Sequence, residues 1–348
     1  MLRTEKSVSI SRAILEKLMK AIVYTQYGTP DVLQLKEVEK PTPRNDEVLI
    51  KVRAVEVTKT CCELRSFNFS VKWFSRPLRI VMGLKKPNQS ILGRYFSGEI
   101  KSVGTNVSKF KVGDQVFGCA TYFGMGAYGE YLRLPVSATI VPKPNNMSFE
   151  EAAAVPIGGL NALHFMRKAN IQNGDRVLIN GAGGSIGSFG VQIAKVMGAE
   201  VTAVDSSNKE EMLRRIGADH FIDYQNEDFT KSSQTYDVIF DMVPQSSYSG
   251  CIKMLNPKGR YLMGNPFLVN MLRSLITSIF TDKTAIFVFA QEKEEELFTL
   301  KEMIEEGKIK SNVDRIYPME QAAEAHRIVE TEQRTGSVVI SMAANNKT

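Results

Sequence analysis

The sequence predicts an α/β protein in which a doubly wound parallel sheet is joined to a second, β-rich domain of barrel type. Two observations support this prediction. Residues 176–205 form the pattern strand, glycine loop, helix, strand, which is a βαβ unit. Residues 19–145 form short β-type runs separated by turn residues, a pattern typical of a small β-barrel. The 348 residues suffice for two such domains of about 150 residues each.

The β-rich first half begins at Met19, where an alternating strand starts. Residues 1–18 precede this strand and predict a short helical extension or a misassigned start codon. Two β-rich runs follow, separated by Pro41 and Pro43, and residues 98–118 predict strand, turn and strand. The first half is therefore expected to form its own compact β-domain.

The second half has a different character. Ser148 followed by Glu151 is a capping box that predicts the start of a helix. Strands and helices then alternate, which predicts a parallel sheet buried on both faces. Residues 267–280 predict an apolar helix that packs in the core or against another subunit, with a lid over an apolar pocket as the alternative. Residues 285–290 predict an edge strand, whose free backbone groups invite pairing in a homodimer.

The C-terminal part completes the alternation. Residues 291–307 predict a charged helix, which leads through residues 316–330 to a last strand at residues 337–340.

The glycine-rich segment is the most specific motif of the chain. Its closely spaced glycines follow the apolar run Val177–Ile179 and are Gly181, Gly183, Gly184 and Gly187. They stand as G-x-x-G-x-x-G, because Ile186 occupies the last position of the stricter G-x-G-x-x-G. Amides of such a loop and of the following helix bind a pyrophosphate. Asp205, 18 residues after Gly187, has the spacing of the carboxylate that binds a ribose diol. We therefore expect a dinucleotide site of Rossmann type, with a glycine turn that binds no ligand as the alternative.

Composition and charge argue against several other classes of protein. The hydrophobic and charged fractions, 43% and 24%, are ordinary for a globular protein, and no apolar run reaches the about 18 residues of a membrane span. The net charge of +6 is not gathered into a stripe, which argues against a nucleic-acid surface. Four cysteines without a CxxC pair, and no secretory signal, predict a cytoplasmic protein.

Several segments together resemble the medium-chain dehydrogenase/reductase superfamily, in particular its zinc-independent quinone oxidoreductase-like branch. They include ILGRYFSGEIKSVGTNVSKFKVGDQVFG, NMSFEEAAAVPIGGLNAL, NGAGGSIG, IGADHFIDY and TGSVVI. The resemblance implies a GroES-like β-barrel-type catalytic domain made from residues 19–145 with 313–348. It implies a Rossmann dinucleotide-binding domain of residues 146–312 inserted between them.

Zinc-dependent members of that superfamily carry metal ligands at three positions that correspond here to Thr58, Arg94 and a residue near Gly159. A tetrahedral zinc site requires Cys, His or carboxylate ligands, and a guanidinium repels the metal. Cys61 and Cys62 lie three and four residues past the first ligand position. The resemblance therefore implies that the chain binds no metal.

A site without zinc is better matched to reduction of an activated acceptor than to alcohol oxidation, because zinc is the Lewis acid that stabilises an alkoxide. The acceptor is then a quinone or the C=C bond of an enal or enone, whose developing oxyanion needs only hydrogen-bond donors and a proton. The candidate donors are Thr58, Arg94 and Tyr95, with Tyr128 more distant. Relatives tend to carry acidic residues where Cys61 and Tyr95 stand, so a more apolar pocket is expected here.

The cofactor is expected to be NADH or NADPH, with NADH slightly favoured. Asp205 repels a 2′-phosphate, by about 1 to 4 kcal/mol at about 4 Å depending on the local dielectric. Ser206, Ser207 and Lys209 resemble a cluster that binds this phosphate in relatives, whereas Ser337 replaces a lysine that many NADPH-using relatives carry. The resemblance implies further cofactor contacts from the loop and from strand ends: Asn161, Gly181, Ala182, Gly183, Gly184, Ser185, Ile186, Gly187, Tyr224, Met242, Val243, Met263, Gly264 and Asn265.

Two other functions stay open at the level of sequence. One is a zinc-free alcohol or aldehyde dehydrogenase, which would need a proton relay near Thr58. The other is an NAD(P)H-binding sensor or adaptor with little catalysis, because a fold does not by itself imply a function.

Overall fold

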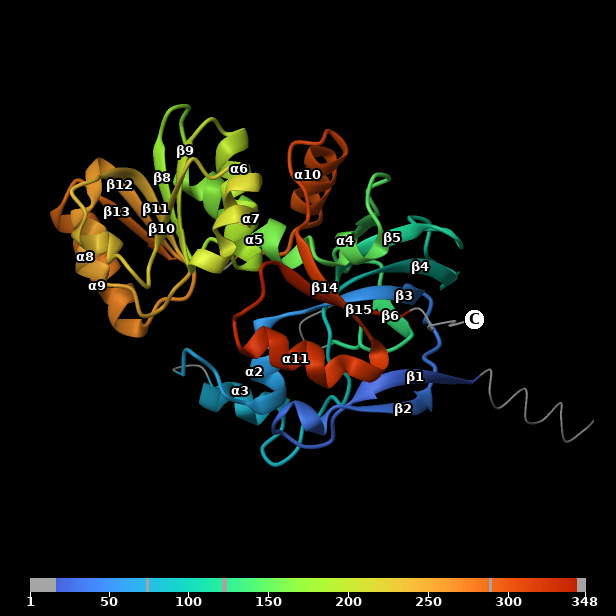
Figure 1. Cartoon of the computed structure of the whole chain (residues 1–348). Helices are drawn as coiled ribbons and strands as arrows, with labels where there is room; N and C mark the ends of the chain where they lie inside the picture. Colours follow the sequence, from blue (N-terminus) through green and yellow to red (C-terminus); the bar gives the residue numbers. More distant parts are fainter. Residues whose placement is uncertain (1–16, 73–74, 121–123, 288–289, 343–348) are drawn as a thin grey trace, which may run out of the picture.

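The computed structural model describes residues 17–72, 75–120, 124–287 and 290–342. Two large sheets dominate these residues, and Figure 1 shows them on opposite sides of the molecule. One is a parallel sheet built from the middle of the chain, and the other is a mixed sheet built from both ends of the chain. The predicted α/β class, with a parallel sheet beside a β-rich domain, is confirmed.

The parallel sheet has six strands in the order β10-β9-β8-β11-β12-β13. Their bounds are His220–Asp223, Glu200–Asp205, Arg176–Asn180, Tyr236–Asp241, Leu255–Met263 and Thr284–Phe287. The chain runs outward from β8 to β10 and then returns to start again at β11, so the strand order reverses between β8 and β11. Ligands of open α/β sheets bind at the carboxyl ends of the strands beside such a reversal.

Both faces of the parallel sheet are buried, as the continuous apolar strands predict. On one face Val177, Ile179 and Phe240 belong to a core with α5 (Pro156–Ala169) and α6 (Ser185–Val196), and α10 (Glu294–Glu305) packs against α5. On the other face Leu178 and Ile239 belong to a second core that includes residues of α8 (Tyr248–Lys253). The alternation of side chains along each strand distributes them between the two cores.

The mixed sheet joins the N-terminal strands to the last strands of the chain. Its order is β14-β15-β3-β4-β5-β7, with β6 also paired to β3. The bounds are Val313–Pro318, Ser337–Ser341, Glu47–Val57, Tyr95–Val103, Gln115–Cys119, Ile140–Pro142 and, for β6, Tyr131–Pro135. β14 and β15 are parallel and the other pairs are antiparallel. β1 (Leu18–Val23) and β2 (Gln34–Glu39) form a separate hairpin, so the first strand begins one residue before Met19.

The helices at the start of the second half follow local signals in the sequence. The hydroxyl of Ser148 accepts from the Glu151 N–H and the Glu151 carboxylate accepts from the Ser148 N–H, so the predicted capping box is confirmed. It opens α4 (Phe149–Ala153). A second helix, α5, starts at Pro156, which lacks the N–H that an uninterrupted helix would need there.

The predicted apolar helix is α9 (Leu268–Phe280), and, unlike a core helix, it buries polar side chains and exposes apolar ones. Its buried positions are the polar residues Asn270, Ser274 and Thr277, and the Thr277 hydroxyl lies 2.7 Å from the Tyr248 hydroxyl. Most of its exposed side chains are apolar, from 51% for Leu268 to 79% for Phe280, with Arg273 and Ser278 as the polar exceptions. The expectation of a helix packed in the core of this chain is therefore wrong.

The strand that follows α9 is β13, at the edge of the parallel sheet. Of the expected residues 285–290, it contains 285–287, and residues 288 and 289 lie outside the described part of the chain. Among the helices of the described residues, none is both long and apolar enough to cross a bilayer.

Candidate functional site

The glycine loop connects β8 to α6 at the carboxyl end of the parallel sheet. The N–H groups of Gly181 and Ala182 donate to the Val204 carbonyl, so the loop crosses over the end of β9. Gly184 precedes the first residue of α6, and no side chain caps this helix. The first amides of an uncapped helix are donors suited to an anion such as a pyrophosphate.

A side chain is disfavoured at three glycine positions of the loop, for a different steric reason at each. Gly181 has φ of +77°, in the left-handed region that favours glycine. A Cβ at Gly187 would lie 2.7 Å from the Cα of Ala182, and this clash cannot be relieved by a side-chain movement because Cα is a backbone atom. A Cβ at Gly183 would lie 3.0 Å from the Asp205 carboxylate. The loop therefore requires glycine for close packing of the helix against the strand.

Asp205 ends β9 and is almost completely buried beside the glycine loop. Its Oδ2 accepts from the Gly183 N–H at 2.7 Å and its Oδ1 accepts from the Ser206 N–H at 2.8 Å. Its Oδ1 also lies 3.0 Å from the Lys209 Nζ, in an ion pair whose two side chains are less than one-tenth exposed. Ser207 and Lys209 form the short 3₁₀ turn after this strand. The carboxylate and the lysine thus lie together where a ribose or its 2′-phosphate would bind.

The other residues expected at the cofactor lie along the same carboxyl edge of the sheet. Tyr224 follows β10 and is 56% exposed, and its N–H donates to the Asp205 carbonyl. Met242 and Val243 follow β11, and Met263 ends β12. A Cβ at Gly264 would lie 2.7 Å from the Met242 Cε, so these two strand ends are in contact. Asn265 donates to the Met242 carbonyl at 3.4 Å. Ser185 and Ile186 open α6, whereas the Asn161 amide donates within α5, to Ile157.

Arg94 and Tyr95 lie at the start of β4 and share one carboxylate partner, Glu292. The Arg94 Nη2 is 2.6 Å from one oxygen of Glu292, and the Tyr95 hydroxyl donates to the other at 2.8 Å. Arg94 and Tyr95 are 6% and 5% exposed. Burial, together with the Glu292 carboxylate, raises the pKa of Tyr95 well above its ordinary value, so its hydroxyl stays protonated. The arrangement presents a cation and a neutral hydroxyl side by side.

Glu292 was missed by the sequence analysis. It lies between β13 and α10, in the acidic run QEKEEE. Several neighbouring glutamates have the same local pattern, so nothing in the sequence distinguishes the one that contacts Arg94. Its selection depends on the tertiary packing of this segment against β4 and on the hydrogen bond from the Thr139 hydroxyl to its carbonyl.

Thr58 lies after β3, at the same end of the sheet as Arg94. The register that pairs Val55 with Phe96 brings the two positions to one edge of the β3–β4 pair. The Thr58 hydroxyl, however, is the N-cap of α2 (Lys59–Ser66), where it accepts from the Cys61 N–H at 3.2 Å and lies 3.3 Å from the Cys61 Sγ. Thr58 therefore has a structural partner that differs from the Arg94 and Tyr95 cluster.

The donor set at the zinc position of related enzymes does not fit a zinc ion. Arg94 is a cation, Thr58 is engaged as a helix cap, and Gly159 lies inside α5 with no side chain. Within the described residues, no group of three His, Cys, Asp or Glu side chains is arranged to hold a metal.

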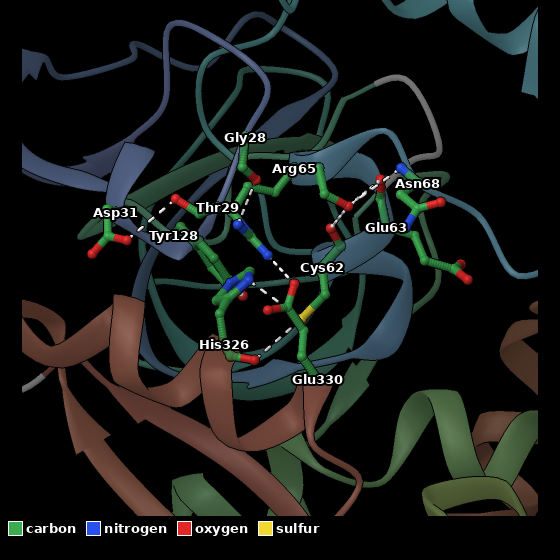
Figure 2. A network of polar contacts seen from close by, with 11 residues as sticks. Gly28, Thr29, Asp31, Cys62, Glu63, Arg65, Asn68, Tyr128, His326 and Glu330 are labelled. Atoms are coloured by element: carbon green, nitrogen blue, oxygen red, sulfur yellow. Dashed lines mark hydrogen bonds and ion pairs between the residues drawn. The ribbon is translucent and has the colours of Figure 1, made fainter.

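A second polar network lies inside the mixed-sheet half, between α2 and α11 (Ala322–Glu330) (Figure 2). The Cys62 Sγ lies 3.4 Å from the His326 Nδ1, and the Tyr128 hydroxyl lies 2.9 Å from the His326 Nε2. Nearby, Arg65 is fully buried, donates to the Gly28 carbonyl at 2.6 Å and pairs with Glu330.

This Cys–His–Tyr chain has the composition of an activated nucleophile but not its environment. Burial lowers the pKa of His326 to about 3 and raises the pKa of Cys62 far above its ordinary value, so imidazole and thiol both stay neutral. All three side chains are buried. The network joins α2, α11 and Tyr128 and has a structural role.

The geometry agrees with comparisons with known proteins. Residues 44–145 match the alcohol dehydrogenase GroES-like domain family, and residues 216–340 match a zinc-binding dehydrogenase family. The chain is 31% identical over 347 residues to the 2-methylene-furan-3-one reductase of Solanum lycopersicum, which covers 97% of this chain and 81% of that protein. It is 28% identical over 345 residues to a quinone oxidoreductase of Pseudomonas aeruginosa, covering 93% of this chain and 99% of that protein.

A solved structure extends the similarity to three dimensions. The quinone oxidoreductase from Coxiella burnetii superposes with a TM-score of 0.83 at 29% identity, covering 94% of this chain and 100% of that one. The chain is an NAD(P)H-dependent oxidoreductase and belongs to the medium-chain dehydrogenase/reductase superfamily, in its quinone oxidoreductase-like branch.

Proposed function

We propose that this chain reduces a quinone, or the C=C bond of an enal or enone, with hydride from NADH or NADPH and without zinc. The observation that supports this most is the buried pair of Arg94 and Tyr95 with their shared partner Glu292. The pair stands where related zinc enzymes carry a metal ligand. It supplies a positive charge and a hydroxyl donor, which is what a developing oxyanion requires.

In this mechanism the bound reduced nicotinamide supplies a hydride. When the β-carbon of an enone accepts that hydride, negative charge develops on the carbonyl oxygen. Arg94 and Tyr95 donate hydrogen bonds to this oxygen, in exchange for the two oxygens of Glu292. A proton delivered by water to the α-carbon completes the saturated product. A quinone accepts one hydride on oxygen or carbon and one proton, and becomes the hydroquinone.

Glu292 competes with the substrate oxygen, because it binds the same two donors, Arg94 and Tyr95. Its side chain is about one-quarter exposed, whereas the two donors are almost buried. Glu292 can therefore be solvated when the substrate displaces it. We propose that Thr58, at the same sheet edge, keeps the start of α2 in place and contributes its hydroxyl only if the cap opens.

For the cofactor we propose that NADH is slightly favoured over NADPH. The support is the buried carboxylate of Asp205, which accepts from the loop amide and would repel a 2′-phosphate. Lys209, paired with the same carboxylate, offsets part of that repulsion. The discrimination is therefore expected to be small in the native chain.

We also propose a cytoplasmic homodimer. The four cysteines are free, in agreement with a reducing compartment. Among the residues that the structure describes, β13 pairs only with β12, which leaves its other edge available to the same strand of a second copy.

The test is turnover in EDTA, followed as nicotinamide oxidation at matched NADH and NADPH concentrations. The panel contains a quinone, an enal, an enone and a simple aldehyde. Turnover of the quinone, enal or enone but not of the aldehyde supports the proposal. Aldehyde turnover alone would favour a zinc-free alcohol dehydrogenase, and binding of the cofactor without any turnover would favour a sensor or adaptor.

A further inference from the structure

A buried carboxylate with an unusual environment lies where the mixed sheet meets the glycine loop. Glu56, on β3, is 0% exposed and is paired in the sheet with Val339 of β15. Its Oε1 accepts from the Ser337 hydroxyl at 2.8 Å and from the Ser185 hydroxyl at 3.1 Å. Ser185 is the first residue of α6, so Glu56 contacts the turn that begins the anion-binding end of this helix.

The second oxygen of Glu56 has no partner. Its Oε2 is buried and makes no hydrogen bond to any described residue. An ionised carboxylate with one unsatisfied oxygen is costly to bury. The protonated acid is less costly, and burial accordingly raises the pKa of Glu56 to about 7, against the opposing effect of the two hydroxyls and of Arg334. At neutral pH the free protein therefore contains both forms.

Several charged groups on the elements around Glu56 have partners of their own. The nearby cation is Arg334, which precedes β15 and is 7% exposed. Among the charged side chains on elements packed around β3 are Glu99 on β4 with its partner Arg53, Glu150 on α4 with Ser341, Glu330 on α11 with Arg65, and Asp205 at the glycine loop with Lys209. Glu56 is therefore the group near the start of α6 whose charge changes with pH in the neutral range.

We propose that Glu56 is a positioning residue that couples binding of the dinucleotide to the uptake of a proton. The protonated acid keeps its contacts to Ser185 and Ser337 and adds no charge beside the first turn of α6. The ionised form adds a negative charge beside the amides that bind the pyrophosphate, and it competes with that anion for the same positive end of the helix. The dinucleotide consequently binds the protonated form more tightly and draws a proton onto Glu56.

The inference rests on the dinucleotide site and not on the identity of the acceptor. If binding raises the pKa of Glu56 by about one unit, the Kd increases by up to about tenfold as the pH rises through the neutral range. At pH 7.5 about half a proton is then taken up per dinucleotide bound. NADH is the appropriate probe, because the 2′-phosphate of NADPH titrates near pH 6 by itself.

The experiment measures NADH binding from pH 6.0 to 8.5 by fluorescence titration, and proton uptake by calorimetry in two buffers of different ionisation enthalpy. The native chain should lose about fivefold to tenfold in affinity across this range and should take up a proton fraction near pH 7.5. Glu56→Gln should bind NADH with a flat profile and no proton uptake. Glu99→Gln, a change in a half-buried carboxylate on the neighbouring strand, should behave like the native chain.

A second variant keeps the test independent of how well Glu56→Gln folds. Ser337→Ala removes a hydrogen bond that lowers the pKa of Glu56, so the midpoint of the affinity profile should move to higher pH. A merely structural role would change the affinity without moving this midpoint. A native-like pH profile in Glu56→Gln, or no movement in Ser337→Ala, would overturn the proposal while leaving the reductase assignment intact. Absence of binding of both NADH and NADPH at every pH would overturn the reductase assignment as well.

Discussion

Asp205 and Lys209 form a buried ion pair at 3.0 Å, and the same carboxylate accepts from the Gly183 N–H at 2.7 Å. The end of β9, the 3₁₀ turn after it and the glycine loop are therefore connected through one side chain. The pair also brings together the two residues that should favour opposite cofactors. We propose that their balance determines how strongly the enzyme discriminates between NADH and NADPH.

Replacing Asp205 with Ser should shift the cofactor preference toward NADPH. The change removes the negative charge that repels a 2′-phosphate and leaves Lys209 free to bind it. We expect the ratio of kcat/KM for NADPH to that for NADH to rise by at least about fivefold. Lys209→Met should move the ratio in the other direction. An unchanged ratio in both variants would mean that this pair does not face the ribose.

Two substitutions in the glycine loop form a matched comparison. A Cβ at Gly187 meets backbone atoms of Ala182 at 2.7 Å, whereas the nearest atom to a Cβ at Gly184 is the Gly181 carbonyl oxygen at 3.5 Å. Gly187→Ala should therefore weaken dinucleotide binding by at least about tenfold or prevent folding, because backbone cannot move away. Gly184→Ala should change the Kd by less than about threefold. Circular dichroism and fluorescence titration measure both effects, and equal Kd values for the two variants would contradict the steric argument.

Arg94 should be required for turnover but not for binding of the cofactor. Removing one donor to a developing oxyanion typically reduces kcat by about a hundredfold to a thousandfold. Arg94→Met should show a loss of this order in kcat/KM for the best acceptor, with an NADH Kd close to that of the native chain. Lys109→Met removes a surface cation paired with Glu294 and serves as the control. A variant Arg94→Met with near-native turnover would remove Arg94 from the mechanism.

Glu292→Gln should show whether Glu292 competes with the acceptor for Arg94 and Tyr95 or orients these two donors for catalysis. The amide keeps the shape of the side chain but binds Arg94 more weakly than the carboxylate does. The acceptor should then displace it more readily, and KM should fall severalfold. A rise in KM together with a loss of kcat would instead indicate that Glu292 orients the two donors.

The buried His326 should make the protein less stable in acid. Its folded pKa of about 3 lies below the value of about 6.5 in an unfolded chain. The unfolded state therefore binds the proton first, and the stability present above pH 6.5 is lost progressively as the pH falls toward 3. Between pH 7.5 and pH 5.0 the native chain should lose about 2 kcal/mol more than His326→Gln.

Urea unfolding at the two pH values measures this difference. The raised pKa of Glu56 makes its contribution to stability fall as the pH rises, which is opposite to the effect of His326. Both proteins contain Glu56, so this contribution to the free energy of unfolding cancels when they are compared. Equal losses in the native chain and in His326→Gln would show that the imidazole is not buried in its neutral form.

The exposed apolar face of α9 offers a test of the homodimer. Leu272 and Ile276 are 64% and 58% exposed, so replacing both with Glu should leave the monomer folded. If a second copy packs against α9 beside β13, the double variant should sediment as a monomer while the native chain sediments as a dimer. A native chain that is monomeric at micromolar concentration would contradict the proposed dimer.

Local patterns in the sequence are sufficient to predict features of the structure that depend on residues close together in the chain. The capping box of Ser148 and Glu151, the glycine loop and the carboxylate at the end of β9 are all features of short segments. The helix at residues 267–280 shows the limit of such reasoning. Its apolar side chains suggested a core helix, but the polar residues Asn270, Ser274 and Thr277 form its buried face.

The sequence by itself determined the fold class, the dinucleotide motif and the superfamily, because periodicity, turn residues and loop spacing act over a few residues. Tertiary structure alone decided that Glu292 contacts Arg94 and Tyr95 and that Glu56 contacts Ser185 and Ser337. These partners are 129 to 281 residues apart in the chain. Contacts at that separation depend on how sheets and loops pack, and burial at the point of contact sets the charge of the groups involved.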